Sequence, residues 1–148
     1  MRKHKAIVFV LALAVLTGMA AWLHLSSREE VAEGTLKMTF ADHVYAVDIS
    51  ELRYEPVSGV RVNGKGEFLP VEGQGISLTD LLESEKIDSY SKVTVISDDS
   101  YHAELTAEEV AEEGRAYLML EEEELRLIVF GDQNSKRSVS NVVQIVIE

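Results

Sequence analysis

Residues 92–148 read KVTVISDDSYHAELTAEEVAEEGRAYLMLEEEELRLIVFGDQNSKRSVSNVVQIVIE, and this stretch decides the fold. Residues 92–97 alternate with the period of two that is typical of a strand with at least one buried face. The residues Asp98, Asp99 and Ser100 follow, and their short acceptor side chains can bond the backbone just ahead, which indicates a turn. Tyr101–Leu105 is therefore predicted to return as the neighbouring strand.

A short helix and three further strands complete this stretch. Thr106 and Glu109 have the spacing of a capping box, in which the threonine hydroxyl accepts the glutamate amide and the carboxylate reaches back. Gly114 lies where such a helix should stop. The remaining apolar runs predict three strands, the first two paired as a hairpin around the acidic tip Glu121–Glu124: Ala116–Leu120, Leu125–Phe130 and Val142–Ile147.

The residues upstream predict the rest of one domain. Pro56 argues against a central strand around it, because proline cannot donate to a ladder. Three apolar runs predict strands, the last of them entering the tight turn Asn63-Gly64: Thr35–Phe40, Val44–Ile49 and Val60–Val62.

A loop-rich middle section and a second helix follow this turn. Glycines at positions 64, 66, 73 and 75 predict loops. Ser77–Asp80 has the composition of a helix N-terminus, and Leu78, Leu81 and Leu82 form the stripe that the helix would bury. About seven strands and two short helices are therefore expected, which is an α+β, mostly β fold in a single domain over residues 35–148.

Composition narrows the classes of function. The 148 residues include no cysteine, which removes disulfides, thiolate catalysis and cysteine-ligated metals. The formal net charge is −12, and four of the 14 basic residues precede Glu29, so the remaining residues carry 26 acids against 10 bases, or −16. Such an acidic surface repels phosphate backbones, so no nucleic acid is expected as a partner.

The N-terminus predicts membrane insertion. Residues 1–5 form a basic leader, and Ala6–Leu25 is apolar apart from Thr17 and His24. At about 1.5 Å per residue this stretch spans roughly 30 Å, the thickness of the hydrocarbon core, so the membrane is its expected partner. The basic leader predicts that the N-terminus stays in the cytoplasm and that the domain lies on the extracytoplasmic side.

Two interpretations of this segment remain open. Gly18-Met19-Ala20 has the small-x-small pattern of a signal-peptide cleavage site, which would release the domain as a secreted protein. The apolar run continues past that site to Leu25, which favours an uncleaved, single-pass anchor in the cell membrane. The chain then divides into a signal peptide or anchor over residues 1–28, a glutamate-rich linker over 29–34, and the domain over 35–148.

Four segments resemble the sulfite-oxidase-type molybdopterin-binding domain. Gly75–Leu82 is similar to that family's "G-V-x-L-x-D-L-L" helix entry, and Val95–Tyr101 to its "S-x-D-G-Y" turn. Leu125–Val129 resembles its "hydrophobic-Arg-hydrophobic-Val" strand, and Lys136–Val142 its "R-S-V-K-W-L" segment. Order and spacing agree from roughly residue 59 to the C-terminus. The resemblance implies an abbreviated sulfite-oxidase-like molybdopterin-binding fold, preceded here by the N-terminal membrane helix.

The departures from that family concern its chemistry. Its enzymes ligate molybdenum through a cysteine thiolate, and neither an alcohol nor an amide replaces such a soft ligand. The family's cofactor-facing lysine is Ser140 here, its tryptophan is Asn141, and the glycine of its turn is Ser100. We therefore expect no metal site and no cofactor, with a molybdopterin-type ligand implied by the resemblance alone.

Searches for catalytic patterns assign no catalytic residue. His43 and His102 lack the spacing of metal ligands. Asp98 and Asp99 form a carboxylate pair, but turn formation explains them more simply. No sequence pattern marks any serine as a nucleophile.

One cluster is a candidate ligand site. If the resemblance holds, the 98–101 turn lies near the 136–140 loop, so that Arg137 can bind a phosphate or carboxylate bidentately beside the flat ring of Tyr101. The alternative is that Arg126 pairs with a hairpin glutamate and Lys136-Arg137 is a solvated loop. The candidate site consists of Asp98, Asp99, Tyr101, Arg126, Lys136, Arg137 and Ser138.

Two functions are compatible with these observations. The first is a membrane-tethered, extracytoplasmic, non-catalytic module with a degenerate molybdopterin-binding fold, which binds a partner protein or a small anionic ligand; an accessory role in a redox system fits it equally well. The alternative is a molybdopterin-dependent oxidoreductase with unusual metal ligation. The missing cysteine favours the first.

Overall fold

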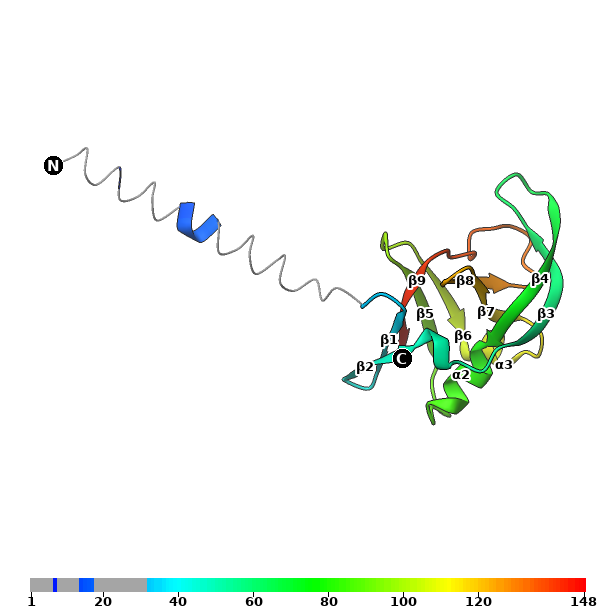
Figure 1. Ribbon diagram of the computed structural model, residues 1–148, viewed down its shortest axis with the longest axis horizontal. Coiled ribbons are helices and arrows are strands. Elements are labelled where there is room, and N and C mark those ends of the chain that lie inside the picture. Colours follow the sequence, from blue (N-terminus) through cyan, green and yellow to red (C-terminus); the bar gives the residue numbers. More distant parts are fainter. Residues whose placement is uncertain (1–6, 8–13, 18–31) are drawn as a thin grey trace. The chain divides into compact units, whose positions relative to one another are not determined.

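The computed structural model describes Ile7, residues 14–17 and residues 32–148 (Figure 1). The chain divides into two units, Met1–Glu30 and Val31–Glu148. Most of the apolar segment Ala6–Leu25, and with it the predicted membrane attachment, therefore falls outside the described residues. Within the described part, no helix is long and apolar enough to cross a membrane.

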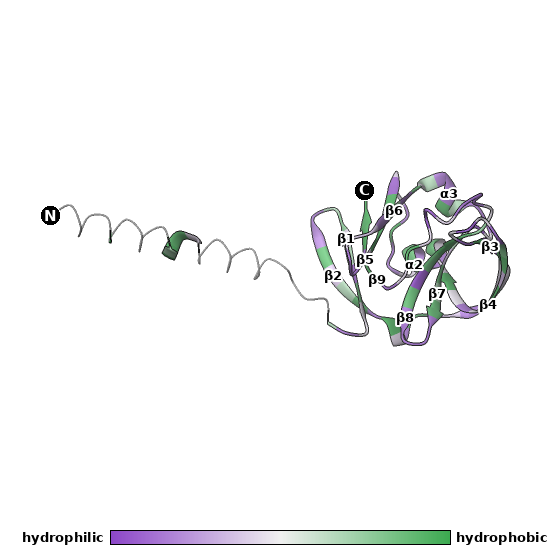
Figure 2. Ribbon diagram, turned by 90° about the horizontal axis from the view of Figure 1, so that it is seen from above, coloured by the Kyte–Doolittle hydropathy of each residue, from purple (hydrophilic) through white to green (hydrophobic). Residues whose placement is uncertain are grey.

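The first of two β-sheets has five strands in the order β2-β1-β9-β5-β6 (Figures 1 and 2). β1 and β9 run parallel, and the other neighbours are antiparallel. The five strands are β1 (Thr35–Phe40), β2 (His43–Asp48), β5 (Lys92–Ser97), β6 (His102–Thr106) and β9 (Val142–Ile147).

The second sheet has four antiparallel strands in the order β3-β4-β7-β8. Its long β3–β4 hairpin curves along one side of the domain (green, at the right of Figure 1). An isolated bridge between Leu127 and Val139 ties its last strand to the segment before β9. The four strands are β3 (Glu55–Val62), β4 (Phe68–Ser77), β7 (Ala116–Glu121) and β8 (Glu124–Val129).

Short helices connect the two sheets. The seven-residue α2 (Leu78–Ser84) begins where the Ser77 hydroxyl accepts the Asp80 amide. The five-residue α3 (Ala107–Ala111) carries the capping box that the sequence predicts at Thr106 and Glu109. A single 3₁₀ turn, η1 (Ile49–Glu51), follows β2.

The main core lies between the facing sides of the two sheets. Side chains at alternate strand positions point to the same face, and Val93 and Val95 of β5 are fully buried together with Leu118 of β7 and Leu127 of β8. Each such side chain contributes about 1.5–3 kcal/mol when it leaves water. This shared core is what fixes the two sheets against each other.

A second apolar cluster lies on the opposite face of the four-stranded sheet. Met119 and Ile128 neighbour the core residues in β7 and β8 but point the other way, and Val57 of β3 packs with them. Three partly buried side chains complete it: Val71, Tyr117 and Phe130.

The contact at Gly59 shows that the four-stranded sheet curls, and the contact at Gly75 shows how closely the paired strands β4 and β7 pack. A Cβ on Gly59 of β3 would lie 2.6 Å from Cε1 of Phe130, which directly follows β8, and a Cβ on Gly75 would lie 2.6 Å from Sδ of Met119. In a flat sheet the first and fourth strands are separated by roughly 14 Å, three inter-strand spacings. The edge strands β3 and β8 therefore approach each other, and only glycine fits at these contacts.

The predicted fold class is wrong. The described residues form a mostly β domain whose helices, of seven and five residues, serve only as connections between strands. The expected membrane helix is not among them, and the sulfite-oxidase-like molybdopterin-binding fold is not shown. The motifs that suggested this fold are a helix cap, a turn, one strand and the loop before the last strand, and such local features do not specify how sheets pair.

The middle section also differs from its prediction as a loop-rich region. The described residues contain nine strands instead of about seven. Residues 68–77 form the ten-residue β4 in spite of Pro70, Gly73 and Gly75. Pro56, which argued against a central strand, lies in β3 at the edge of its sheet, where a missing donor is tolerated.

Candidate functional site

A groove of about 630 Å³ runs along β3, between this edge strand and the start of the loop that follows β8. Its walls come from segments far apart in the sequence, which the curl of the four-stranded sheet brings together. The groove is lined by Pro56, Val57, Ser58, Gly59, Val60, Val62, Phe68, Gly114, Tyr117, Phe130, Gly131, Asp132 and Gln133.

The hydrogen-bond pattern of β3 determines which main-chain groups face this groove. β3 pairs with β4 in unbroken register, and one step further the Asn63 amide donates to the Glu67 carbonyl over 3.0 Å. Bonded and non-bonded pairs alternate along an antiparallel ladder, so the odd-numbered residues of β3 bond β4. Ser58, Val60 and Val62 therefore turn their N–H and C=O groups towards the open edge.

Nothing in the described part of the chain pairs with that edge. Within residues 32–148, β4 is the only strand paired with β3. Two apolar side chains near the edge are exposed, with 53% of Val60 and 71% of Phe68 accessible to water, whereas Val62 is buried. An unpaired row of donors and acceptors beside exposed apolar side chains is a template for another strand.

The opposite wall of the groove is aromatic. The rings of Tyr117 and Phe130 meet edge to face, with centroids 5.8 Å apart and planes at 64°. Both pack on the second apolar cluster, so their positions are fixed by the sheet below them. The groove thus combines free backbone groups on one side with a rigid apolar surface on the other.

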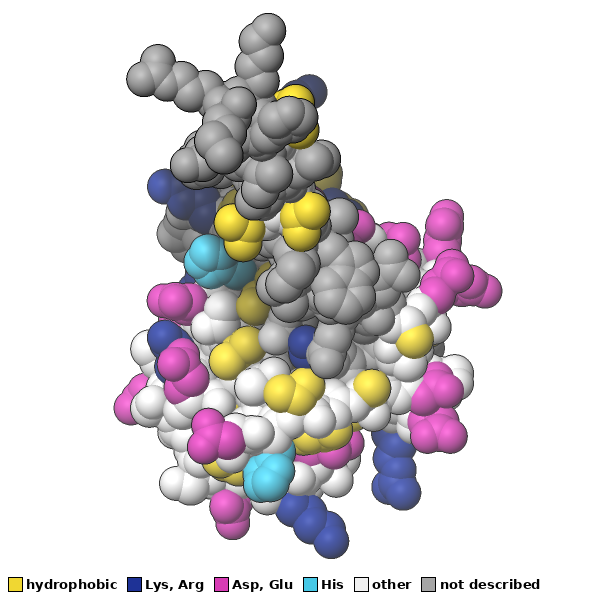
Figure 3. Space-filling view, turned by 90° about the vertical axis from the view of Figure 1, so that its left-hand side faces the viewer, with side chains coloured by type: hydrophobic (Ala, Val, Ile, Leu, Met, Phe, Trp, Pro, Cys, Tyr) yellow, Lys and Arg dark blue, Asp and Glu magenta, His cyan; other side chains and the backbone are white. Residues whose placement is uncertain are grey.

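The electrostatic potential around the groove is negative at one end. Burial raises the pKa of Tyr117, and the carboxylates of Glu55, Asp80 and Glu113 raise it further. Elsewhere on the domain, carboxylate side chains are distributed around the surface that Figure 3 shows. The groove therefore has an aromatic wall of Tyr117 and Phe130, polar side chains at Ser58, Asp132 and Gln133, and carboxylates near its Tyr117 end.

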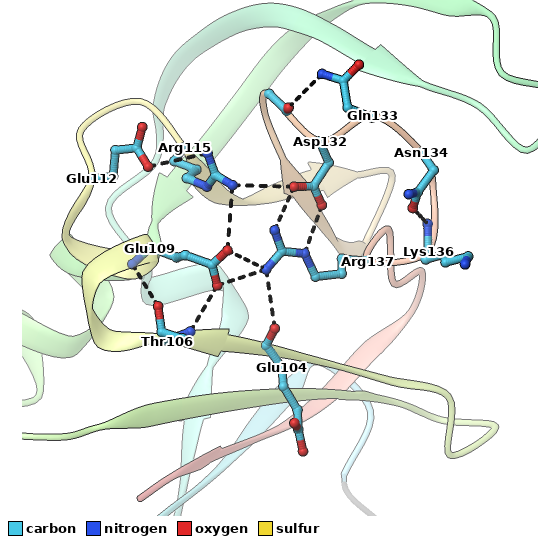
Figure 4. A network of polar contacts seen from close by, with 11 residues as sticks. Glu104, Thr106, Glu109, Glu112, Arg115, Asp132, Gln133, Asn134, Lys136 and Arg137 are labelled. Atoms are coloured by element: carbon cyan, nitrogen blue, oxygen red, sulfur yellow. Dashed lines mark hydrogen bonds and ion pairs between the residues drawn. The ribbon is translucent and has the colours of Figure 1, made fainter.

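Arg137, the centre of the sequence-predicted site, lies in a network of ion pairs (Figure 4). Its Nε and Nη2 donate to the two oxygens of Asp132 over 2.8 and 2.6 Å. Its Nη1 donates to both oxygens of Glu109 over 2.9 Å and to the Glu104 carbonyl over 3.4 Å. The bond to Asp132, assisted by Glu109, raises the pKa of Arg137.

Arg115 extends this network. Its guanidinium lies 3.6 Å from Glu109, 3.5 Å from Asp132 and 3.3 Å from Glu112. Burial disfavours the charged form of Glu109, but the Thr106 amide and the two arginines outweigh it, so the pKa of Glu109 is lowered. We call Glu109, Arg115, Asp132 and Arg137 the ion-pair clamp, because they tie α3 and the segment before β7 to the loop after β8.

The structure brings part of the predicted site together. The Tyr101 hydroxyl donates to the Lys136 carbonyl, so the 98–101 turn does lie beside the 136–140 loop. Asp99 accepts the Tyr101 amide over 2.9 Å, and Asp98 accepts the Ser97 hydroxyl over 3.0 Å. Asp99 thus acts as a turn-forming acceptor, whereas Asp98 is bonded to the side chain of the residue before it.

The other predicted residues are directed elsewhere. Arg126 donates to Glu121 across the β7–β8 hairpin over 2.8 Å, which is the alternative that the sequence left open. The Ser138 hydroxyl is buried, without a hydrogen-bond partner among the described residues. Tyr101 therefore contacts the residue before Arg137, whereas Arg126 is bound at the β7–β8 hairpin, and a ligand bound by all three stays a prediction.

Arg137 is not free to bind an anionic group of a molybdopterin. Arg137, the cation expected to meet an anionic group, is already bound to two carboxylates. A phosphate entering there would face Asp132 and Glu109 as well, and like charges repel it. Among the described residues, no group of three or more histidine, aspartate or glutamate side chains is arranged to hold a metal ion.

Sequence reasoning missed the groove because it interpreted residues 64–75 as loops. The signal was present in Val60 and Val62, which alternate with Arg61, and in Phe68 across the turn. The closeness of Phe130 to β3 was not available from any local pattern, because it depends on the curl of the whole sheet.

The comparisons with known proteins add no relative. No family model matches the chain, and no curated protein is similar to it. Its function is therefore inferred from the geometry of the groove and of the ion-pair clamp.

Proposed function

We propose that this domain is a non-catalytic binding module that takes an extended segment of a partner protein as an additional strand along β3. The observation that carries this proposal is the open edge of β3, whose outward main-chain groups line a preformed groove with an aromatic wall. In strand addition, main-chain hydrogen bonds give affinity, and pockets for alternate side chains give specificity.

The shape of the groove favours an extended segment as its occupant. Val60 lies on β3 itself and Phe68 on β4 opposite Val62, so a parallel or antiparallel strand that bonds the outward groups of Ser58 and Val60 covers Val60 directly and reaches Phe68 with a side chain across β3. The opposite wall, formed by Tyr117 and Phe130, contacts the side chains that the added strand turns inward. A compact ligand reaches either wall but leaves the edge groups unpaired.

Charge indicates the kind of segment that binds. Residues 29–148 carry 26 acids against 10 bases, and Asp132, the only charged side chain among the described residues that line the groove, is held by the clamp. A basic segment is attracted by such a domain and an acidic one is repelled, which affects both the association rate and the choice of partner.

The expected affinity is moderate. Each main-chain hydrogen bond contributes about 0.5–1.5 kcal/mol net, and covering Val60 and Phe68 adds about 25 cal/mol per Å² of apolar surface. Association itself costs several kcal/mol. We therefore expect dissociation constants on the order of micromolar, in the range of transient recognition.

Peptide display tests this function. The probe is a library of random twelve-residue peptides, selected on the full chain in mild detergent. Selected peptides are then measured against two variants, Val60→Pro and Val44→Pro. Val60→Pro removes an outward amide of β3 and keeps an apolar side chain of similar size, whereas Val44→Pro makes the same change at the edge strand β2.

The proposal requires peptides that bind the original chain and the Val44→Pro variant alike and lose affinity for the Val60→Pro variant. Selected peptides that bind all three proteins equally would place the site elsewhere. A selection that enriches no peptide at all contradicts the proposal as well, because a preformed edge needs no cofactor to act.

A further inference from the structure

The two ends of the groove along β3 differ in their chemistry. At one end, Glu55 of β3 lies opposite Gly75 of β4, and Tyr117 of β7 lies opposite Ser77. Glu55 and Tyr117 thus flank the same end of β4 from its two sides. At the other end of the groove, Val62 of β3 lies opposite the exposed Phe68.

Three carboxylates gather around the first end. Asp80 lies close to Ser77, the residue opposite Tyr117, because the Asp80 amide donates to the Ser77 hydroxyl. Glu113 directly precedes Gly114, which lines the groove. Together with Glu55 they act electrostatically on Tyr117. None of the three forms an ion pair with a lysine or arginine of the described residues, so their charges are not neutralised there.

The basic side chains near the groove do not change this picture. Arg115 and Arg137 are held by the carboxylates of the ion-pair clamp. Arg61, two residues from Gly59 along β3, lies towards the Phe68 end. Arg53, two residues before Glu55, offsets one of the three carboxylates, and Glu67 beside Phe68 offsets one of the two bases Arg61 and Lys65. The field along the groove is therefore negative at the Glu55 end and more positive towards Phe68.

The Glu55 end also offers an aromatic ring. A cation over the face of a tyrosine is attracted by the ring quadrupole, and the carboxylates beside Tyr117 add a direct Coulomb attraction. At the Phe68 end an aliphatic or aromatic side chain finds exposed apolar surface instead. The Glu55 end thus favours a positively charged side chain of an extended occupant, and the Phe68 end favours an apolar one.

We infer that the segment added to β3 carries a lysine or arginine beside Tyr117, between Glu55 and Glu113, and an apolar side chain beside Phe68. This inference rests on the proposed strand addition and specifies the partner's chemistry within it. The occupant is a partner segment with a basic residue at one end and apolar residues along the rest.

Synthetic probes of defined charge test the inference. The probes are acetylated and amidated decapeptides of alternating valine and threonine, in which one terminal position is lysine, norleucine or glutamate. Each is made with the substitution at either end, because the direction of the added strand is not specified. Binding to the full chain is measured by isothermal titration calorimetry at low and at high salt.

We expect the protein to bind a positively charged probe more tightly than a neutral one, and the variants identify the carboxylates responsible. At low salt one lysine probe should bind about 5- to 10-fold more tightly than its norleucine counterpart, and the glutamate probe more weakly than both. High salt should reduce the difference, because screening weakens exposed charges. The double variant Glu55→Gln, Glu113→Gln should abolish the preference, whereas Glu122→Gln, Glu124→Gln at the hairpin tip should keep it.

The possible outcomes distinguish failure of this inference from failure of the proposed strand addition. If lysine and norleucine probes bind equally, and Val60→Pro weakens both while Val44→Pro does not, strand addition stands and the cationic preference is overturned. If no probe binds, or if Val60→Pro changes nothing, the proposed function itself is overturned. A free chain that sediments as a dimer, and that Val60→Pro converts to a monomer, would instead make a second copy the occupant and contradict both.

Discussion

The edge strands β2 and β3 present nearly the same local structure, one in each sheet. Val44 of β2 and Val60 of β3 are exposed to 55% and 53%. The two-residue turn Ala41-Asp42, with positive φ at both positions, makes Phe40 and His43 a bonded pair, so the next residue, Val44, points its main-chain groups outward. Val60 does the same in β3.

The difference lies in what stands opposite each edge. β3 faces Tyr117 and Phe130 across the groove, and the loop carrying Asp132 closes its far side. β2 forms the outer strand of the five-stranded sheet, and Val44 lies next to a tight turn. An unpaired edge is therefore not sufficient for a binding site. Under the proposed strand addition, the second wall, built from residues distant in sequence, is what would make the β3 edge selective.

Removing the support of that wall should produce the largest effect. Arg137→Ala leaves Asp132 and Glu109 partly buried without their main partner, and we expect it to lower the free energy of unfolding by about 2–3 kcal/mol. Because Asp132 lines the groove, peptide binding at β3 should weaken as well. Urea unfolding of the full chain, followed by circular dichroism because Trp22 lies outside the domain, measures the first effect.

Arg126→Ala is the matched control for that variant. It removes one arginine from an exposed pair with Glu121 on the same sheet, and such pairs contribute about 0.2–1 kcal/mol. Equal losses in the two variants would show that the clamp is no more than a surface ion pair. The comparison between β2 and β3 would then lose its structural basis.

Blocking each edge in turn tests the comparison directly. We expect Val60→Pro to weaken a selected peptide about 10- to 100-fold, because it removes one donor and introduces a ring at the strand contact. Val44→Pro should leave that affinity unchanged. Both variants should cost similar, small amounts of stability, since proline is tolerated at outward positions of edge strands; a large loss for Val60→Pro alone would mean that β3 is not a free edge.

The close packing of β4 against β7, the strand that carries Tyr117 of the second wall, is tested at two glycines on one face of β4. A methyl group on Gly75 would lie 2.6 Å from Sδ of Met119 and 3.1 Å from the Leu118 carbonyl, so Gly75→Ala should destabilise the domain by about 1–3 kcal/mol. Gly73→Ala meets only an ordinary contact at 3.5 Å and should be neutral or slightly stabilising. Thermal unfolding of the two variants gives the comparison, and equal melting temperatures would contradict the close approach.

These glycines also show what the sequence was able to predict. The strands with regular alternation, such as residues 92–97, and the capping box at Thr106 were predictable because each depends on a local pattern. β4 was not, since Pro70 and Gly75 resemble loop residues until their neighbours in the sheet are known. A local pattern states which faces are apolar, but it does not state which distant strand covers them.

The candidate site illustrates the same limit. The contact of Tyr101 with the 136–140 loop agreed with expectation because the 98–101 turn and that loop adjoin the paired strands β5 and β9. The role of Arg137 did not follow from its own segment, because its partners Glu109 and Asp132 come from α3 and from the loop after β8. Whether a basic residue is free or paired depends on tertiary contacts that no spacing rule contains.

Lowering the pH should have the smallest effect on the free energy of unfolding, and it should act through the ion-pair clamp beside the β3 groove. The folded-state pKa of Glu109 lies below its ordinary value, so the stabilisation is complete above about pH 4.5 and is lost as the pH falls through the lowered pKa. Arg137 stays charged throughout, so the carboxylate is the group that titrates. Glu109→Gln should therefore be less stable than the original chain at neutral pH, and the difference should shrink in acid.

Urea unfolding at several pH values measures this difference, with Glu121→Gln in the exposed Arg126 pair as the control. Parallel stability curves for Glu109→Gln and the original chain would mean that Glu109 is not the acid-sensitive part of the clamp, and that acid does not distinguish the supported edge from the free one.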